Sequence, residues 1–223
     1  MALPCKILYM FKFNLFVFTL CLFFSGCLKS GYKEAVVYNN NFTTGNTSNL
    51  TGAVLWNWNG QKLIGRYNNG GFDLDLNNLP SHTALEITVV PYFHDSWDGS
   101  TNVGGIDGPD IWQMKVDGNL LVNSTFSNSP CNSMYCLQQS YPLPYSTINN
   151  PPMTNAIQIL PGVGHCSGID ATSVYKMVKT IAHSSSSVKI SFHDLLVQTN
   201  VPDKLCDESW SMSSIVVKTI NNP

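Results

Sequence analysis

Acidic side chains, glycines and tryptophans are concentrated in one stretch of the sequence, FHDSWDGSTNVGGIDGPDIW, which covers residues 93–112. A second acidic pair, Asp207 and Glu208, lies in the segment CDES near the C-terminal end. Residues of these types can do three kinds of chemistry. Carboxylates and backbone carbonyls bind calcium, tryptophan rings stack on sugar rings, and paired carboxylates hydrolyse glycosidic bonds. Each kind requires a fold that brings separate loops together.

Calcium is the first prediction, because it takes about six to eight oxygen ligands, mostly from carboxylates and carbonyls. No acidic segment has the spacing of an EF-hand, so the site would be assembled from separate loops and would be structural rather than catalytic. The competing interpretation is that these aspartates begin turns by bonding nearby amides. The predicted ligands are Asp95, Asp98, Asp107, Asp110, Asp207 and Glu208.

Sugar binding is the second prediction. Trp97, inside the acidic stretch, is the best candidate for stacking on a sugar, whereas Trp112 and Trp210 lie in or beside expected strands and are expected to pack in the core. The predicted ligand-binding residues are Asp95, Trp97, Asp98, Asp110 and Trp58.

Catalysis has less support. Asp73 and Asp75 share a strand face, but nothing distinguishes that face from a solvated sheet surface. The sequence has no Gly-x-Ser-x-Gly motif, and its histidines are scattered singly without metal-ligand spacing. We therefore predict no catalytic residue and keep a polysaccharide-degrading hydrolase or lyase as an alternative.

Short runs of alternating polar and apolar residues, bounded by Gly, Asn, Pro and Ser, recur along the chain, and helical periodicity is almost absent. These runs predict an all-β, antiparallel jelly-roll β-sandwich of about ten strands. The runs are residues 34–38, 53–58, 62–67, 71–76, 83–93, 110–116, 120–126, 173–182, 187–193 and 214–220.

The links between these runs alternate in length. Residues 94–109, 127–172 and 194–213 are long links, and residues 77–82, 117–119 and 183–187 are short ones. Successive antiparallel strands run in opposite directions, so all the long links are expected at one end of the sandwich. This end would hold both acidic segments. A strand missed within 127–172 would reverse the expectation for every later link.

The N-terminal segment resembles an export signal. Lys6 and Lys12 precede the apolar run LFVFTLCLFF, which is shorter than the ~20 residues that span a bilayer. Residues 24–27, FSGC, overlap the end of this run and resemble a bacterial lipobox ending at Cys27, with Phe where Leu is usual. We expect residues 1–26 to be a lipoprotein signal peptide, 27–33 a tether and 34–223 one β-sandwich domain. Translation from Met10 would give a more typical signal.

Four cysteines remain after such processing: Cys131, Cys136, Cys166 and Cys206. An even number in an exported protein predicts two disulfides, and the sequence leaves all three possible pairings open. A zinc site formed by these thiols with His165 is the alternative.

The formal net charge is −2, and Arg66 is the only arginine in the sequence. This balance argues against nucleic-acid binding, which requires a basic face.

Several motifs together resemble a lectin-like, galactose-binding-like β-sandwich module found in secreted and surface proteins of bacteria. They are LIGRYNNGGFDLDLNNLPSHTALEITVVPYFHDSWDG, GPDIWQMKVDG, LLVNSTFSN, QQSYP and CDESWSMSSIVV. The resemblance covers roughly residues 36–219 and implies a jelly roll without catalytic activity that serves in binding or adhesion. Two departures are the insertion at Cys131–Cys136 and the final SWSMSSIVV, which lacks an acid of the expected SWGLDNV and weakens the calcium prediction.

The sequence thus predicts a non-catalytic carbohydrate-binding or adhesion module with a glycan or cell-surface partner. It would contact the membrane only through its lipid anchor. We expect it in the bacterial cell envelope, at the outer membrane, with a secreted form as the alternative. A purely structural envelope lipoprotein is the remaining hypothesis.

Overall fold

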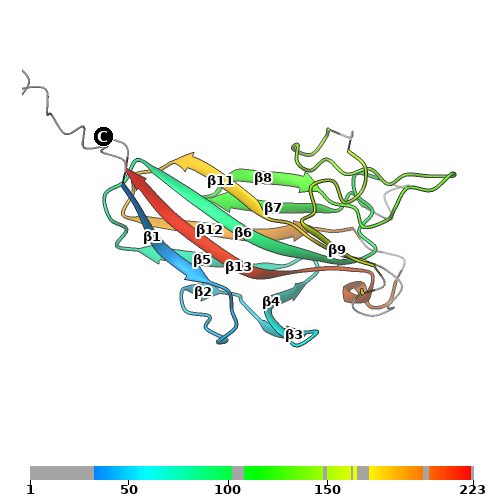
Figure 1. Cartoon of the computed structure of the whole chain (residues 1–223), viewed down its shortest axis with the longest axis horizontal. Coiled ribbons are helices and arrows are strands. Elements are labelled where there is room, and N and C mark those ends of the chain that lie inside the picture. The colour runs from blue at the N-terminus through cyan, green and yellow to red at the C-terminus, as the bar shows by residue number, and fades with distance from the viewer. Residues whose placement is uncertain are drawn as a thin grey trace, which may run out of the picture. The chain divides into compact units, whose positions relative to one another are not determined.

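The computed structural model (Figure 1) describes residues 33–101, 108–147, 150–161, 163–164, 171–197 and 201–221. The predicted signal peptide, Cys27, Asp107, His165 and Cys166 lie outside these residues. The part of the chain that is described contains no helix with the length and apolar character needed to cross a bilayer.

The described residues form two antiparallel sheets, so the predicted all-β sandwich is confirmed. The large sheet contains β1 (Lys33–Asn40), β3 (Leu55–Trp58), β4 (Gln61–Tyr67), β6 (Ala84–Asp95), β9 (Gln158–Leu160), β10 (Thr172–Val174), β11 (Met177–Ala182) and β13 (Glu208–Asn221). The small sheet contains β2 (Leu50–Thr51), β5 (Gly71–Asn77), β7 (Ile111–Val116), β8 (Asn119–Thr125) and β12 (Ser187–Leu195). A single 3₁₀ turn, η1 (Lys204–Cys206), precedes β13.

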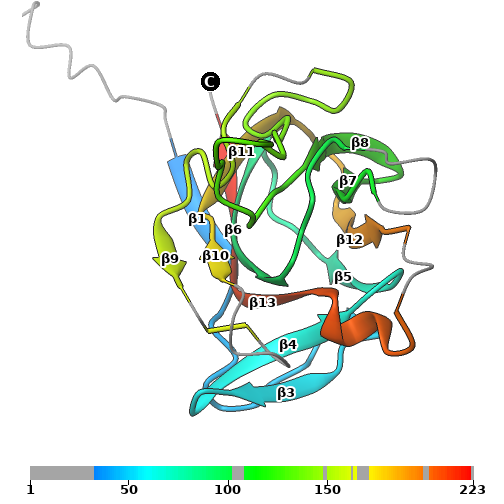
Figure 2. The ribbon, with the colours of Figure 1, turned by 90° about the vertical axis from the view of Figure 1, so that its right-hand side faces the viewer.

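The strand registers confirm the prediction that all the long links lie at one end of the sandwich. At one end Glu208 pairs with Asp95 and Thr172 with His94, and at the other Ile220 and Ala182 both pair with Ala84. The three long links therefore leave from the same end, here called the loop end, as Figure 2 shows in an end-on view. The opposite end, the short-turn end, holds residues 78–83, 117–118 and 183–186. The short β9, missed in the sequence, pairs with β10 and does not reverse this order.

The strand boundaries differ from the sequence prediction at Pro91, in the middle of β6. Proline has no backbone N–H to donate, which interrupts the ladder on the side where the Pro91 carbonyl accepts from the Tyr175 amide. On one side the expected strand 173–182 divides into β10 and β11, and on the other β13 has a bulge between Met212 and Ser214. The first half of β13 was also missed, because residues 208–213 are buried on both faces and do not alternate.

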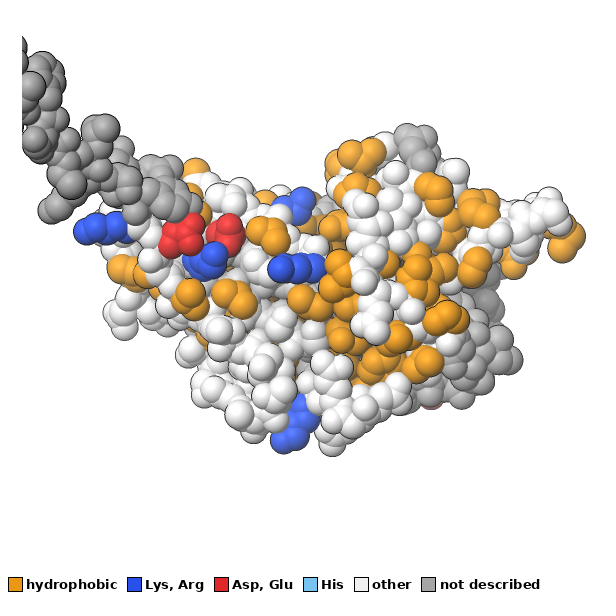
Figure 3. Space-filling view, in the orientation of Figure 1, with side chains coloured by type: hydrophobic (Ala, Val, Ile, Leu, Met, Phe, Trp, Pro, Cys, Tyr) orange, Lys and Arg blue, Asp and Glu red, His pale blue; other side chains and the backbone are white. Residues whose placement is uncertain are grey.

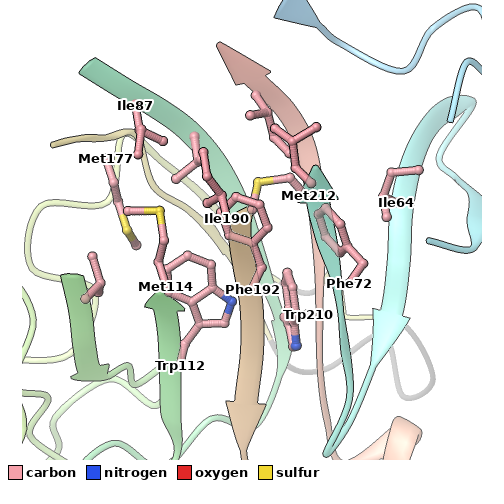
Figure 4. Close-up of a cluster of buried hydrophobic side chains, with 14 of the residues drawn as sticks. Ile64, Phe72, Ile87, Trp112, Met114, Met177, Ile190, Phe192, Trp210 and Met212 are labelled. Atoms are coloured by element: carbon pink, nitrogen blue, oxygen red, sulfur yellow. The ribbon is translucent and has the colours of Figure 1, made fainter. Parts of the chain in front are cut away.

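The core lies between the inner faces of the two sheets (Figure 4). Trp112 and Trp210 are fully buried there, as predicted, with their ring centroids 5.7 Å apart and nearly perpendicular. Phe72 and Phe192 from the small sheet pack beside them, with ring centroids 5.0 Å apart. Close-packed aromatic rings of this kind dominate the burial energy of a core.

Gly71, at the start of β5, marks a place where the two central strands of the small sheet approach closely. A Cβ atom at Gly71 would collide with the carbonyl oxygen of Phe192 on β12. We predict that Gly71→Ala lowers the free energy of unfolding by roughly 2–3 kcal/mol, because backbone has to move to make room.

Gly70→Ala is the matched control, since its nearest neighbour would be Tyr67 Cδ1 at 3.5 Å. Urea denaturation of both variants measures the difference. Equal stabilities of the two variants would contradict the predicted close approach.

Candidate functional site

The loop end brings together the two acidic segments. Asp95, the last residue of β6, pairs with Glu208, the first residue of β13. The amide and hydroxyl of Ser96 donate to the Asp207 carbonyl and carboxylate at 2.8 and 3.0 Å. The amide of Asp98 donates to Asp110 Oδ2. These contacts make one cluster, the acidic cluster, from Asp95, Asp98, Asp110, Asp207 and Glu208.

The acidic cluster is largely sealed from solvent, contrary to the picture of an open acidic loop. Asp95 and Asp110 are 0% exposed and Glu208 is 1% exposed. Asn128 covers the end of β6, where its side-chain amide donates to the carbonyls of Phe93 and Asp95 at 3.0 and 2.9 Å. Asp95 and Asp110 were predicted to contact a ligand directly, and their burial prevents this. For the same reason these buried acids offer no carboxylate pair to a glycosidic bond.

One proton is held within the acidic cluster. The carboxyl groups of Asp110 and Glu208 are hydrogen-bonded to each other, which requires that one of them keep its proton. Burial, assisted by the charges of Asp98 and Asp207 and opposed by the hydrogen bonds of the Asp98 amide and Glu208, raises the pKa of Asp110 to about 8. Asp110 and Glu208 therefore hold one proton between them as a coupled pair.

The described acids alone do not fit calcium. The donor set consists of oxygen atoms, as calcium prefers. However, within the described ranges no group of three or more His, Cys, Asp or Glu side chains is arranged to hold a metal ion. Asp107, another predicted ligand, lies outside these ranges. Calcium binding stays a prediction that depends on ligands beyond the described acids.

Trp97 does not act as a sugar-stacking residue, because it is 0% exposed. Its indole N–H donates to the Ser209 carbonyl at 2.9 Å, and its ring packs against Phe93 with centroids 4.7 Å apart. The prediction of a stacking role was wrong because Trp97, two residues after the end of β6, turns back into the core.

A different group of rings lies on the outer face of the large sheet. It is called here the aromatic patch and consists of Trp56, Trp58, Tyr92 and His94. Trp56 and Trp58 come from β3, and Tyr92 and His94 come from β6. Trp58, one of the predicted ligand-binding residues, packs against His94 and Tyr92 with centroids 4.9 and 5.7 Å apart. It is 7% exposed, so it supports the patch from below.

Trp56 forms the outer part of the aromatic patch. Its side chain is half-buried and its ring lies edge-on to His94 at a centroid distance of 5.3 Å. The guanidinium carbon of Arg66 lies 5.7 Å from its centroid, a cation–π distance. Asn59 and Gly60, both with positive φ, form the two-residue turn that joins β3 to β4 and places Trp56 at the edge of the sheet.

His94 joins the aromatic patch to the interior as a neutral side chain. Thr172 Oγ1 donates to the Val163 carbonyl, so it accepts from His94 Nδ1 at 3.0 Å, and His94 Nε2 accepts from Ser211 Oγ at 2.7 Å. Burial, reinforced by the positive charge of Arg66, lowers the pKa of His94 to about 3.

The face of the molecule that carries these residues is divided (Figure 3). Charged side chains gather over its short-turn half, and hydrophobic side chains cover much of its loop half. The charged half includes Lys218, which pairs with Glu34 and Glu86 at 3.4 and 3.0 Å. The aromatic patch belongs to the loop half. Trp56 and Trp58 lie on β3, which forms a hairpin with β4, and β4 pairs with β13 only at Trp210–Met212, near the loop end.

The cysteine predictions are partly confirmed. Cys131 and Cys136 form a disulfide that closes a short segment of the longest link. This bond removes two of the thiols that a zinc site would need. Cys206 is also disulfide-bonded, and since Cys131 and Cys136 bond each other, its partner lies outside the described residues. Of the three pairings that the sequence left open, the one that contains the Cys131–Cys136 bond also joins Cys166 to Cys206, and this second bond is not tested.

Sequence reasoning missed Trp56, Tyr92, His94 and Arg66 as members of one site. One signal was present, because Trp56 and Trp58 are two residues apart in a strand and must share a face. The contact between this hairpin and the end of β6 depends on pairing through β13, which the local sequence does not reveal.

No family model matches the chain, and no curated protein matches it. Solved structures with some likeness include a family 35 carbohydrate binding module from Clostridium thermocellum, with 10% identity, 83% of this chain and 97% of that chain covered, and a TM-score of 0.34. The C-terminal CBM6 of a laminarinase from Zobellia galactanivorans shows 11% identity, coverage of 83% and 98%, and a TM-score of 0.31. A cycloisomaltooligosaccharide glucanotransferase from Paenibacillus sp. shows 9% identity, coverage of 80% and 18%, and a TM-score of 0.33. These likenesses assign the chain to no family.

The proton that Asp110 and Glu208 hold between them predicts a pH-dependent stability. The unfolded chain holds an aspartate proton only below pH ~4, whereas the folded state holds this one up to about pH 8. The stability it contributes is thus fully present below pH ~4 and is lost as the pH rises toward 8. The Asp110→Asn amide can hydrogen-bond to Glu208 without an ionisable proton, so the variant should match the wild type in acid and exceed its melting temperature increasingly up to pH 8.

Differential scanning calorimetry across this range measures the difference between the melting temperatures of the two proteins. His94 is present in both, so its opposite effect on the pH dependence of stability cancels in this difference. A variant that is less stable than the wild type at every pH would show that Asp110 is ionised in the folded protein.

Proposed function

We propose that the protein is a non-catalytic carbohydrate-binding module displayed on the cell envelope by a lipid on Cys27, and that it binds glycan at the aromatic patch. The observation that carries the proposal is the arrangement of Trp56 at the sheet edge, with Arg66 at 5.7 Å from its ring and Trp58, Tyr92 and His94 packed behind it. The predicted loop-end site moves accordingly from the buried Asp95, Trp97 and Asp110 to the adjacent outer face.

The chemistry of the aromatic patch suits a sugar because apolar and polar groups alternate over a short distance. A sugar ring presents C–H bonds on its faces, which pack on an indole, and hydroxyls around its edge, which require hydrogen-bond partners. The exposed Gln61 accepts a hydrogen bond from the Tyr92 hydroxyl at 3.4 Å, and Arg66 is half-exposed. A small number of polar groups beside a hydrophobic surface is the usual composition of a ligand site.

The position of Lys33, the first residue of β1, supports the proposed display by a lipid on Cys27. Lys33 begins β1 beside Asn221, the last residue of β13, at the short-turn end. Cys27 precedes Lys33 by six residues, which reach at most ~20 Å when extended. The twelve residues of β6 separate the two ends of the sandwich by about 40 Å. A lipid on Cys27 would therefore attach the domain by its short-turn end, opposite to the loop end.

Glycan binding is tested on an array of plant and microbial polysaccharides, run once with calcium and once with chelator. We predict binding without product release, and a loss of affinity of roughly tenfold or more for Trp56→Ala, because a central aromatic contact is removed. Leu55→Ala is the matched control, since Leu55 is the exposed neighbour of Trp56 on the same strand.

Three outcomes would overturn parts of this proposal. Shortened oligosaccharides would identify the protein as a hydrolase or lyase. Binding that Trp56→Ala leaves unchanged would place the site elsewhere. A melting temperature that is the same in calcium and in chelator would remove calcium from the proposal.

Lipid attachment is a separate prediction. The wild type expressed with its signal in a bacterium should partition into detergent and show the mass of a diacylated N-terminal cysteine, while Cys27→Ala should not. Identical soluble masses, apart from the substitution, would refute the lipid anchor. Glycan binding by the soluble domain does not depend on this result.

A further inference from the structure

Two histidines that lie far apart in the sequence meet at the short-turn end. His82 Nε2 lies 2.7 Å from His183 Nδ1, and the ring planes differ by 14°. The ring centroids are 5.0 Å apart. Rings that stack face to face would not bring two nitrogens so close at that centroid distance, so the rings meet edge to edge in nearly one plane. This is the geometry of a short N–H···N hydrogen bond.

The outer nitrogen of each ring is also bonded. His82 Nδ1 lies 2.6 Å from the carbonyl oxygen of Pro80, which can only accept, so this nitrogen carries a proton. His183 Nε2 lies 3.1 Å from Asp117 Oδ2. The carboxylate of Asp117 forms an ion pair with His183 and can only accept a hydrogen bond. His183 Nε2 therefore carries a proton as well.

Counting protons leads to one conclusion. Two neutral imidazoles have one proton each, and both of these are used by the bonds to Pro80 and Asp117. The facing nitrogens of His82 and His183 would then be two lone pairs 2.7 Å apart, which repel each other. We propose that His82 and His183 bind one additional proton between them, and that this shared proton is a pH-sensitive clasp for the short-turn end of the sandwich.

A proton fits this gap and a metal ion does not. A zinc–nitrogen bond is about 2.0 Å long, so an ion between two nitrogens that face each other in one plane needs close to twice that separation. The outer nitrogens of the two rings bond a carbonyl and a carboxylate, and bonds of this kind also orient metal-binding histidines. Here they orient the rings toward a proton instead, because the turns hold the nitrogens too close for a metal.

The positive charge is balanced by Asp117. His82 is 4% exposed and the His183 side chain is 7% exposed, so the charge is shielded from water. Two lysines of the neighbouring strands pair with other acids. Lys189 Nζ pairs with Asp73 and Asp75 on the outer face of the small sheet, and Lys218 Nζ pairs with Glu34 and Glu86 on that of the large sheet.

The clasp joins the two sheets. Pro80 and His82 belong to the link from β5 in the small sheet to β6 in the large sheet. His183 follows β11 in the large sheet, and Asp117 is in the turn between β7 and β8 in the small sheet. Asp117 Oδ1 also accepts from the amide of Lys189 on β12 at 2.9 Å. Loss of the shared proton at alkaline pH would thus release one bond that ties three turns together.

Asp117→Asn is the decisive variant because it removes the need for the extra proton. The new amide can donate to His183 Nε2, after which His183 Nδ1 donates to His82 Nε2 and both rings are neutral. The amide oxygen still accepts from Lys189, and asparagine tolerates the positive φ of 49° at this position in an Asn-Gly turn. The variant should therefore fold.

The proposal predicts two measurements. By ¹⁵N NMR of histidine-labelled protein at pH 7, three of the four ring nitrogens of His82 and His183 should carry protons in the wild type, and two in Asp117→Asn. As the pH rises from 6 to 9, the melting temperature of the wild type should fall relative to that of Asp117→Asn by about 3 °C or more, because a buried hydrogen bond is lost only in the wild type.

His183→Gln provides a second comparison, since glutamine cannot hold the additional proton, and its melting curve should lack the same alkaline step. Two protonated nitrogens in the wild type would overturn the proposal. An alkaline step that is equal in all three proteins would overturn it too, as would a step that chelator abolishes and zinc restores. None of these results depends on glycan binding.

Discussion

The long antiparallel ladder between β6 and β13 is the interaction on which the rest of the structure depends. It runs from Glu208 opposite Asp95 to Ile220 opposite Ala84, the full length of the sandwich. Every other strand of the large sheet is attached to it, directly or through one neighbour. Because β6 ends where β13 begins, this ladder places the two acidic segments side by side. It also brings the β3–β4 hairpin, bound to the first part of β13, against the last residues of β6.

Burial rather than proximity decides what the residues at the loop end can do. Proximity alone would make Asp95, Asp110 and Glu208 a polar site. Their exclusion from water instead makes the ionised form of Asp110 unfavourable and leaves a neutral carboxyl as a structural hydrogen-bond donor. The same sealing places Trp97 in the core. The side chains here that solvent and a ligand can reach are instead on the outer face of the large sheet, at Trp56, Gln61 and Arg66.

Much of the architecture could be predicted from the sequence, because alternation and link length are local properties. The strands around Leu85 and Ile190, the core positions of Trp112 and Trp210, and the common end of the long links were all found in this way. Side-chain partners across sheets were not accessible. Nothing in the residues around His82 indicates a partner 101 positions away, and nothing around Trp97 indicates that its ring turns inward. Both outcomes depend on strand pairing that is settled only by the complete fold.

The pairing of β1 with the second half of β13 has a mechanical consequence. A tether at Lys33 would pull from the short-turn end, while a ligand held at the aromatic patch would pull from the other. The load then acts along the strand axes, and the bonds between Lys33–Asn40 and Ile215–Asn221 bear it in parallel as a shear. If both forces were applied at the same end of the two strands, the same hydrogen bonds would break one after another. A pull on Lys33 along the strand axis would therefore have to break these hydrogen bonds together before β1 could leave the sheet.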